Sequence, residues 1–158
     1  MADNEILNEI SENLQKGKAP VVKEKVQQAL DAGIGPDTIL NEALVKGMGV
    51  IGEKFKRNEV YVPEVLIAAR AMNGAMEILK PQLVESGIKP KATALLGTVK
   101  GDLHDIGKNL VCMMLEGAGY EVVDMGVNVE PEAFVAGVEK HNAQLIGLSA
   151  LLTTTMGA

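Results

Sequence analysis

The chain has 158 residues, 47% of them hydrophobic and 23% charged, which is the balance of an ordinary globular protein of one or two domains. A net charge of −6 argues against nucleic-acid binding, because no basic stripe is available for phosphates. The single cysteine, Cys112, excludes an internal disulfide and fits a reducing compartment. The N-terminus is acidic, unlike a signal peptide, and no apolar run approaches a membrane span, so we expect a cytoplasmic protein without membrane partners.

Residues 1–88 are predicted to form a helical domain. Apolar residues recur at three- and four-residue spacing in four segments, 6–14, 20–30, 36–55 and 63–79. Pro20 and Pro63 suit the first turns of the second and fourth segments, and Pro81 is expected to end the fourth. Four short helices with brief connections predict a small antiparallel four-helix bundle.

Residues 89–158 have a different pattern, which begins after the polar linker "ESGIKPK" (85–91). The apolar runs "ATALLGTV" (92–99), "YEVVDMG" (120–126) and "LIGLSAL" (145–151) are typical of buried strands, and helical segments separate them. This alternation predicts an α/β domain with a doubly wound parallel sheet of the flavodoxin or Rossmann type. Three strands would leave an edge and a face uncovered, so we expect the domain to lack its last strands, about two, in this chain.

The segment "GDLHDIG" (101–107) carries the most distinctive chemistry of the sequence. It leaves the first predicted strand at its carboxyl end, the edge of a doubly wound sheet at which ligands bind. Asp102 and His104 are two residues apart, so their side chains can point to the same side of an extended loop. A carboxylate on one imidazole nitrogen fixes the tautomer and leaves the other nitrogen for a metal or a proton. Gly101 and Gly107 permit close backbone approach to a bulky ligand.

Each of these residues also has a plainer interpretation. His104 could be a surface residue, and either Asp102 or Asp105 could cap the helix that follows. Lys108 is expected to be a solvated helix residue. The polar residues after the third strand lie at the same predicted sheet edge but carry little information alone, since Ser and Thr are common there. The conjunction of these features at one edge favours a site.

Two separated motifs resemble the signature of cobalamin-binding domains. That signature reads Asp-x-His-x-x-Gly, then Ser-x-Leu, then a Gly-Gly pair, and this chain has "DLHDIG" at 102–107 and "SAL" at 149–151. The stretch "GMGVIGEKFKRNEVYVPEVLIAARAM" (47–72) resembles the helical cap of the methylcobalamin branch, found in methionine synthase and in the corrinoid proteins of bacterial and archaeal methyltransferase systems. The resemblance covers nearly the whole chain. The Gly-Gly pair is missing and would lie beyond Ala158.

The resemblance implies a role for each matching residue. His104 would be the lower axial ligand of cobalt, in place of the cofactor's own dimethylbenzimidazole. Asp102 would hydrogen-bond His104, and Thr155 would extend that relay at a position where relatives often have Ser. Phe55 and Val62 would shield the upper face of the cofactor. The full set of implied cofactor-binding residues is Met48, Phe55, Val62, Asp102, His104, Asp105, Gly107, Ser149, Leu151, Thr153 and Thr155, with Ser149 and Leu151 lining the slot for the displaced nucleotide tail and Thr153 nearby.

The function implied by the resemblance is that of a methyl carrier, which is a subunit rather than a complete enzyme. Its cofactor would be cobalamin or a related corrinoid. Its expected partners are a donor methyltransferase, an acceptor methyltransferase and a reductive activase. Two alternatives share parts of the pattern: a cobalamin-dependent regulator or photosensor, which would need a basic DNA-binding helix, and the small subunit of an adenosylcobalamin mutase, which usually lacks the helical cap. Without the resemblance, the fallback is a phosphate-binding flavodoxin-like receiver, but no acidic cluster or Gly-rich phosphate loop follows the first strand.

Overall fold

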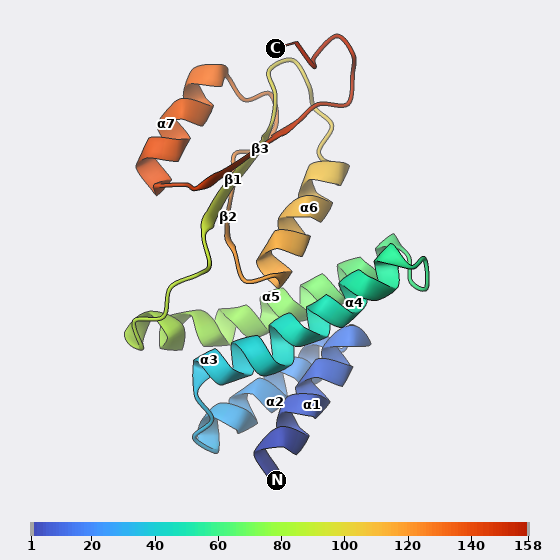
Figure 1. Ribbon diagram of the computed structural model, residues 1–158, viewed down its shortest axis with the longest axis vertical. Helices are drawn as coiled ribbons and strands as arrows, with labels where there is room; N and C mark the ends of the chain where they lie inside the picture. Colours follow the sequence, from blue (N-terminus) through green and yellow to red (C-terminus); the bar gives the residue numbers. More distant parts are fainter. Residues whose placement is uncertain (1, 158) are drawn as a thin grey trace. The chain divides into compact units, whose positions relative to one another are not determined.

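The computed structural model describes residues 2–157, and the chain divides into two compact units at the Lys89–Pro90 bond (Figure 1). The first unit is helical and the second is an α/β unit, so the expected fold class is confirmed. Over the residues that the structure describes, no helix combines the length and the apolar character required to cross a membrane.

The helical unit is formed by α1 (Ala2–Gln15), α2 (Ala19–Asp31), α3 (Pro36–Thr38), η1 (Ile39–Val45), α4 (Lys46–Lys56) and α5 (Val62–Glu85). The third predicted helix is thus helical from residue 36 to residue 56, but its middle part, η1, has the wider π-helical turn. The apolar residues at helical spacing form the core, which includes Leu7, Ile10, Leu14, Val22, Val26, Leu44, Ile51, Val65, Met72 and Leu79.

The prediction that the last helix ends before Pro81 is wrong, because α5 continues to Glu85. Proline inside a helix removes one backbone hydrogen bond, at a cost of about 3 kcal/mol. The turn after Pro81 carries Leu83, which is buried, and burial of a leucine side chain contributes about 1.5–3 kcal/mol. The hydrophobic contact therefore offsets most of the proline penalty, and the helix extends until its apolar stripe is covered.

The α/β unit alternates strands and helices along the chain: β1 (Thr93–Thr98), α6 (Ile106–Gly117), β2 (Glu121–Asp124), α7 (Pro131–His141) and β3 (Leu145–Ser149). All strand pairs are parallel and the order is β2-β1-β3. The two helices pack on opposite faces. Side chains on one face of β1 (Ala94, Leu96) contact the α6 side around Cys112, whereas Leu95 on the other face lies with Phe134 of α7.

The register of the sheet brings two chain segments to one edge. Thr98, the last residue of β1, pairs with Ser149, the last residue of β3. The loop that follows β1 (99–105) and the segment that follows β3 (150–157) therefore start side by side at the carboxyl ends of their strands. Within the described part of the chain no strand lies beyond β3, and its apolar residues Ile146 and Leu148 are exposed.

Candidate functional site

The loop after β1 is shaped by a glycine and an asparagine. Gly101 has φ of +79°, a left-handed conformation that glycine adopts without steric penalty. Its N–H donates to Oδ1 of Asn128 at 2.8 Å, and the N–H of Asn128 donates to the carbonyl of Asp102 at 3.0 Å. Asn128 itself has φ of +53°, a conformation that asparagine tolerates better than most residues. The loop carrying Asp102 is therefore tied to the loop that follows β2.

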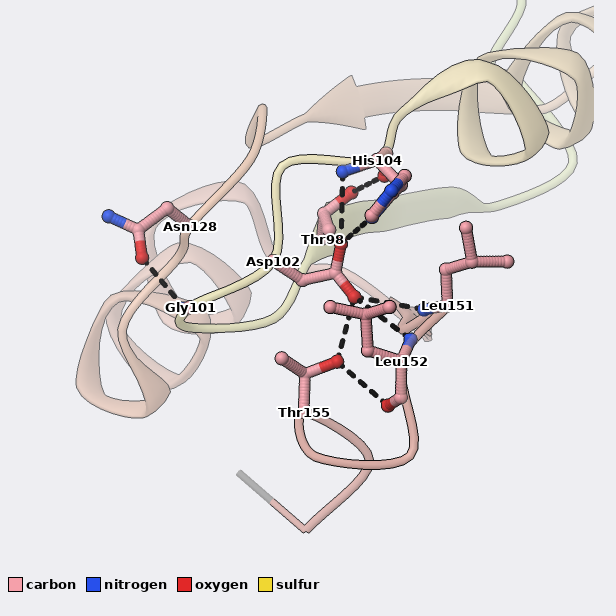
Figure 2. A network of polar contacts seen from close by, with 8 residues as sticks. All are labelled: Thr98, Gly101, Asp102, His104, Asn128, Leu151, Leu152 and Thr155. Carbon is pink, nitrogen blue, oxygen red and sulfur yellow. Dashed lines mark hydrogen bonds and ion pairs between the residues drawn. The ribbon is translucent and has the colours of Figure 1, made fainter.

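Asp102 is the centre of the polar network drawn in Figure 2, and its side chain is fully buried. Oδ1 accepts the backbone N–H of His104 at 2.9 Å and contacts His104 Nδ1 at 2.6 Å. Oδ2 accepts the N–H of Leu151 at 2.9 Å and the hydroxyl of Thr155 at 2.7 Å, with the N–H of Leu152 farther away at 3.5 Å. One carboxylate thus joins the loop after β1 to the turn after β3.

This hydrogen bonding keeps Asp102 ionised. The backbone N–H groups of His104 and Leu151 and the hydroxyl of Thr155 hold the pKa of the Asp102 carboxyl far below its ordinary value of 3.8, and they outweigh burial, which acts in the opposite direction. An ionised carboxylate can only accept hydrogen bonds, so Nδ1 of His104 must carry the proton. In the neutral imidazole the lone pair is then on Nε2.

The His104 side chain is half-exposed, in contrast to its buried partner. Two apolar residues close to it in the sequence, Leu103 and Ile106, are 71% and 84% exposed. The hydroxyl of Thr98 donates to the backbone carbonyl of His104 at 2.9 Å. The arrangement presents an imidazole nitrogen lone pair on a backbone held by hydrogen bonds.

A cavity of about 320 Å³ lies between α6 and β3. Two of the predicted cofactor-binding residues, Gly107 and Ser149, line it, and a side chain added at Gly107 would meet no atom within 4 Å. Leu151 and Thr153 follow on the turn after β3 and are exposed. The lining residues are Leu96, Gly107, Lys108, Val111, Gly147, Leu148, Ser149 and Ala150.

The remaining predicted residues have different surroundings. Asp105 precedes α6 but makes no side-chain capping bond; it accepts a hydrogen bond from Asn109 at 3.3 Å. In the helical unit, Phe55 and Val62 are 37% and 40% exposed, near the turn between α4 and α5. Met48 is buried, with 3% exposure.

The expectation that Lys108 is a solvated helix residue is wrong. Its side chain is 2% exposed, and Nζ lies 2.6 Å from both carboxylate oxygens of Asp124 and 2.7 Å from Oδ1 of Asn109. Burial acts to raise the pKa of Asp124, but the Lys108 ammonium and the N–H of Gly126 outweigh it, so the pKa of this carboxyl is lowered. The ion pair joins the first turn of α6 to the end of β2.

We expect Asp124→Asn to destabilise the α/β unit by about 1–3 kcal/mol, because the substitution leaves the Lys108 ammonium buried without its counter-charge. The half-exposed Asp124 keeps the effect below that of a fully buried pair. The double variant Lys108→Met/Asp124→Asn should recover most of the loss, since the buried charge is gone. Urea unfolding measures both; a single variant as stable as the wild type would show that the Lys108 charge finds other stabilisation.

Thr98 and Asn128 also belong to the site, although neither was predicted from the sequence. Thr98 is a polar residue at the end of an otherwise apolar strand, and that contrast was a usable signal. Asn128 lies 27 positions from Gly101, and nothing in the local sequence indicated their contact. Within residues 2–157 no group of three or more His, Cys, Asp or Glu side chains is arranged to hold a metal ion.

Comparison with known proteins identifies both units. Residues 6–80 and residues 92–158 each match a family model described as a B12 binding domain. The chain is 39% identical over 154 residues to a corrinoid protein of Desulfitobacterium hafniense, covering 96% of this chain and 71% of that protein. It is 39% identical over 160 residues to monomethylamine corrinoid protein 2 of Methanosarcina acetivorans, covering 99% of this chain and 74% of that protein.

The solved structures agree with this assignment. The crystal structure of the methanol:cobalamin methyltransferase complex MtaBC from Methanosarcina barkeri contains a chain that is 36% identical, with a TM-score of 0.88, covering 96% of this chain and 58% of that one. A cobalamin-binding protein from Desulfitobacterium hafniense gives a TM-score of 0.74 at 29% identity, covering 96% of this chain and 71% of that one. The chain therefore belongs to the corrinoid proteins of methyltransferase systems, which act as methyl carriers and have a B12-binding cap and a B12-binding domain.

Proposed function

We propose that His104 supplies the axial ligand from the protein to the cobalt of the corrinoid, through Nε2. The observation that carries this proposal is the pair formed by His104 Nδ1 and Asp102 Oδ1 at 2.6 Å, which leaves the Nε2 lone pair available on a half-exposed ring. A corrinoid brings its cobalt already bound by the nitrogens of the macrocycle, so a single imidazole fits what it requires. The exposed apolar side chains of Leu103 and Ile106, on the same chain segment as His104, suit contact with a large macrocycle.

The residues around His104 have roles in holding its proton and the nucleotide tail. Asp102 would keep the proton on Nδ1 and so leave Nε2 for the cobalt. Thr155 would orient the second carboxylate oxygen. The cavity between α6 and β3, with Gly107 and Ser149 in its wall and Leu151 and Thr153 following β3, would accommodate the displaced nucleotide tail.

In the helical unit, Phe55 and Val62 would contribute apolar contacts to the corrinoid. Phe55 and Val62 expose apolar surface near the turn between α4 and α5, which suits them to keep water from the reacting face. Met48, also among the implied cofactor-binding residues, has a buried side chain in α4. When bound, the corrinoid supplies the chemistry, since its cobalt accepts and releases the methyl group.

The partners would be the enzymes that load and unload the carrier. The relative in the MtaBC structure is part of a methanol:cobalamin methyltransferase complex, which supports a donor methyltransferase as one partner of this chain. A second methyltransferase would pass the methyl group to an acceptor, and a reductive activase would restore oxidised cobalt. The one cysteine, Cys112, is free and buried, which supports a reducing, cytoplasmic location.

A test of the cobalt ligand uses electron paramagnetic resonance of the loaded chain with cobalt in the paramagnetic Co(II) state. Protein labelled with nitrogen-15 and unlabelled protein are each loaded with ordinary cobalamin. If a histidine of the chain is the ligand, labelling changes the nitrogen splitting of the cobalt signal from a triplet to a doublet, because the nuclear spin changes from 1 to 1/2. An unchanged triplet would mean that the dimethylbenzimidazole of the cofactor remains bound, and the proposal would be wrong.

A separate experiment tests the carrier role by measuring methyl transfer from the loaded chain to an acceptor. Chain loaded with isotopically labelled methylcobalamin is mixed with an acceptor methyltransferase and a thiol or tetrahydrofolate. Label should appear in the acceptor only when the chain and the enzyme are both present. Transfer of label at the same rate from free methylcobalamin would show that the chain has no part in delivering the methyl group.

A further inference from the structure

Thr98 is a polar residue at a position in the apolar core. It is the last residue of β1, and its side chain is fully buried. Along β1 it continues the row formed by Ala94 and Leu96, which faces α6 and belongs to the apolar core. A valine has almost the same shape and would fill this position without a polar group. A buried hydroxyl at such a place needs a partner, and the identity of that partner indicates its role.

The partner of the Thr98 hydroxyl is the backbone carbonyl of His104, at 2.9 Å (Figure 2). Thr98 itself is firmly held: its N–H donates to the carbonyl of Gly126 and its carbonyl accepts the N–H of Val129, both at 2.9 Å. Among residues 2–157, the Thr98 hydroxyl is the group that donates a hydrogen bond to the backbone carbonyl of His104. A rigid strand is thus connected to the backbone of the candidate cobalt ligand.

The other two hydrogen bonds of His104 do not fix it by themselves. Its N–H and its Nδ1 both bond to the same atom, Oδ1 of Asp102. Two bonds that meet at one atom still allow the residue to pivot about that atom. The bond from Thr98 attaches His104 at a separate atom, its backbone carbonyl oxygen, and restricts this movement.

We propose that Thr98 is a positioning residue for the cobalt ligand: its hydroxyl fixes the backbone of His104, so that Nε2 is presented at one place and one angle. The proposal rests on the proposed function of His104. It predicts that loss of the hydroxyl loosens the loop in the protein without cofactor and weakens coordination in the loaded protein. If the hydroxyl served only the stability of β1, its loss would change neither the mobility of the His104 loop nor the coordination of cobalt.

The test compares Thr98→Val, which removes the hydroxyl and keeps the shape, with Thr98→Ser, which keeps the hydroxyl. Thr93→Val is the matched control, because Thr93 lies at the other end of the same strand and its hydroxyl bonds to Glu121 instead. In the protein without cofactor, amide hydrogen exchange at His104, followed by NMR, should be about 2- to 10-fold faster in Thr98→Val, the factor expected from one lost hydrogen bond. Exchange in Thr98→Ser and in Thr93→Val should match the wild type.

In the loaded protein, the absorption spectrum reports the fraction of cofactor with the imidazole on cobalt. We expect this fraction to fall in Thr98→Val and to be retained in Thr98→Ser and Thr93→Val. Wild-type exchange at His104 in Thr98→Val, or an imidazole-bound fraction equal to that of Thr93→Val, would overturn the proposal. If Thr98→Val does not fold, Thr98→Ala against Thr98→Ser makes the same comparison, since both lack the methyl group and only one lacks the hydroxyl. Failure of the proposed function is recognised separately. If His104 is not the cobalt ligand, loaded His104→Ala will have the same absorption spectrum as the loaded wild type.

Discussion

Replacement of His104 by alanine is expected to convert the loaded protein from an imidazole-bound absorption spectrum to that of the base-off cofactor. Alanine has no side-chain nitrogen to bind cobalt, and no other side chain of the loop occupies the position of the His104 imidazole. Loss of an outer-shell partner of a metal ligand typically lowers affinity by about 10- to 100-fold, and loss of the ligand itself should cost at least as much. Equilibrium dialysis with cobalamin measures the change in affinity, and the spectrum measures the change in coordination.

The chain offers a matched control for this experiment, because it has two histidines. His141 lies in the last turn of α7, which leads into the amino end of β3, whereas His104 follows the carboxyl end of β1. His141→Ala should bind cobalamin with the wild-type spectrum. Free imidazole added to His104→Ala should restore part of the six-coordinate spectrum, since the cavity left by the side chain admits it. An imidazole-bound spectrum in His104→Ala without added imidazole would refute the assignment.

The architecture was predictable from hydrophobic periodicity. The errors in that prediction arose where tertiary contacts outweighed local sequence signals. The spacing of Ile10 and Leu14 in α1, or of Met72 and Leu79 in α5, indicates helices because those side chains must share a face. Pro81 is a strong local signal for a helix end, yet burial of Leu83 beyond it extends α5 by a further turn. The free-energy cost of Pro81 in the helix and the gain from burying Leu83 are of similar size. The end of α5 therefore depends on the tertiary contact of Leu83, which the local sequence does not show.

The site divides in the same way between local and long-range information. The hydrogen bond between Asp102 and His104 spans two residues, so the sequence spacing alone makes it plausible. The ion pair of Lys108 spans 16 positions and depends on the pairing of α6 with β2, which the sequence does not specify. A lysine on a helix is usually solvated, and only the packed structure shows that this one is buried.

Asp102→Asn is expected to disrupt the network more than any other single substitution that preserves side-chain size. The two carboxylate oxygens accept from two donors at Oδ1 and from Leu151 N–H and the Thr155 hydroxyl at Oδ2. Asparagine has one oxygen and one NH₂ group, so whichever way it turns, an NH₂ group faces donors in a fully buried position. Unsatisfied buried donors should lower the melting temperature of the α/β unit by on the order of 10 °C.

The pH dependence of this difference distinguishes the lost charge from a general loss of packing. Because the folded-state pKa of Asp102 lies below 3.8, its carboxylate stabilises the folded protein above pH 3.8, and this contribution is lost as the pH falls below that value toward the folded-state pKa. Asp102→Asn has no such titration. The gap in melting temperature between the wild type and Asp102→Asn should therefore be widest at neutral pH and narrow below pH 3.8.

A neighbouring substitution provides the control for Asp102→Asn. Asp105→Asn makes the same chemical change three residues away, where the carboxylate accepts one long hydrogen bond from Asn109 and asparagine is equally acceptable before a helix. Its melting temperature should stay close to that of the wild type. If both variants melt alike, or if the gap for Asp102→Asn is the same at pH 3 and pH 7, then the buried carboxylate does not organise this edge of the sheet. The expected result instead makes one ionised side chain responsible both for the orientation of His104 and for the turn that carries Leu151 and Thr155.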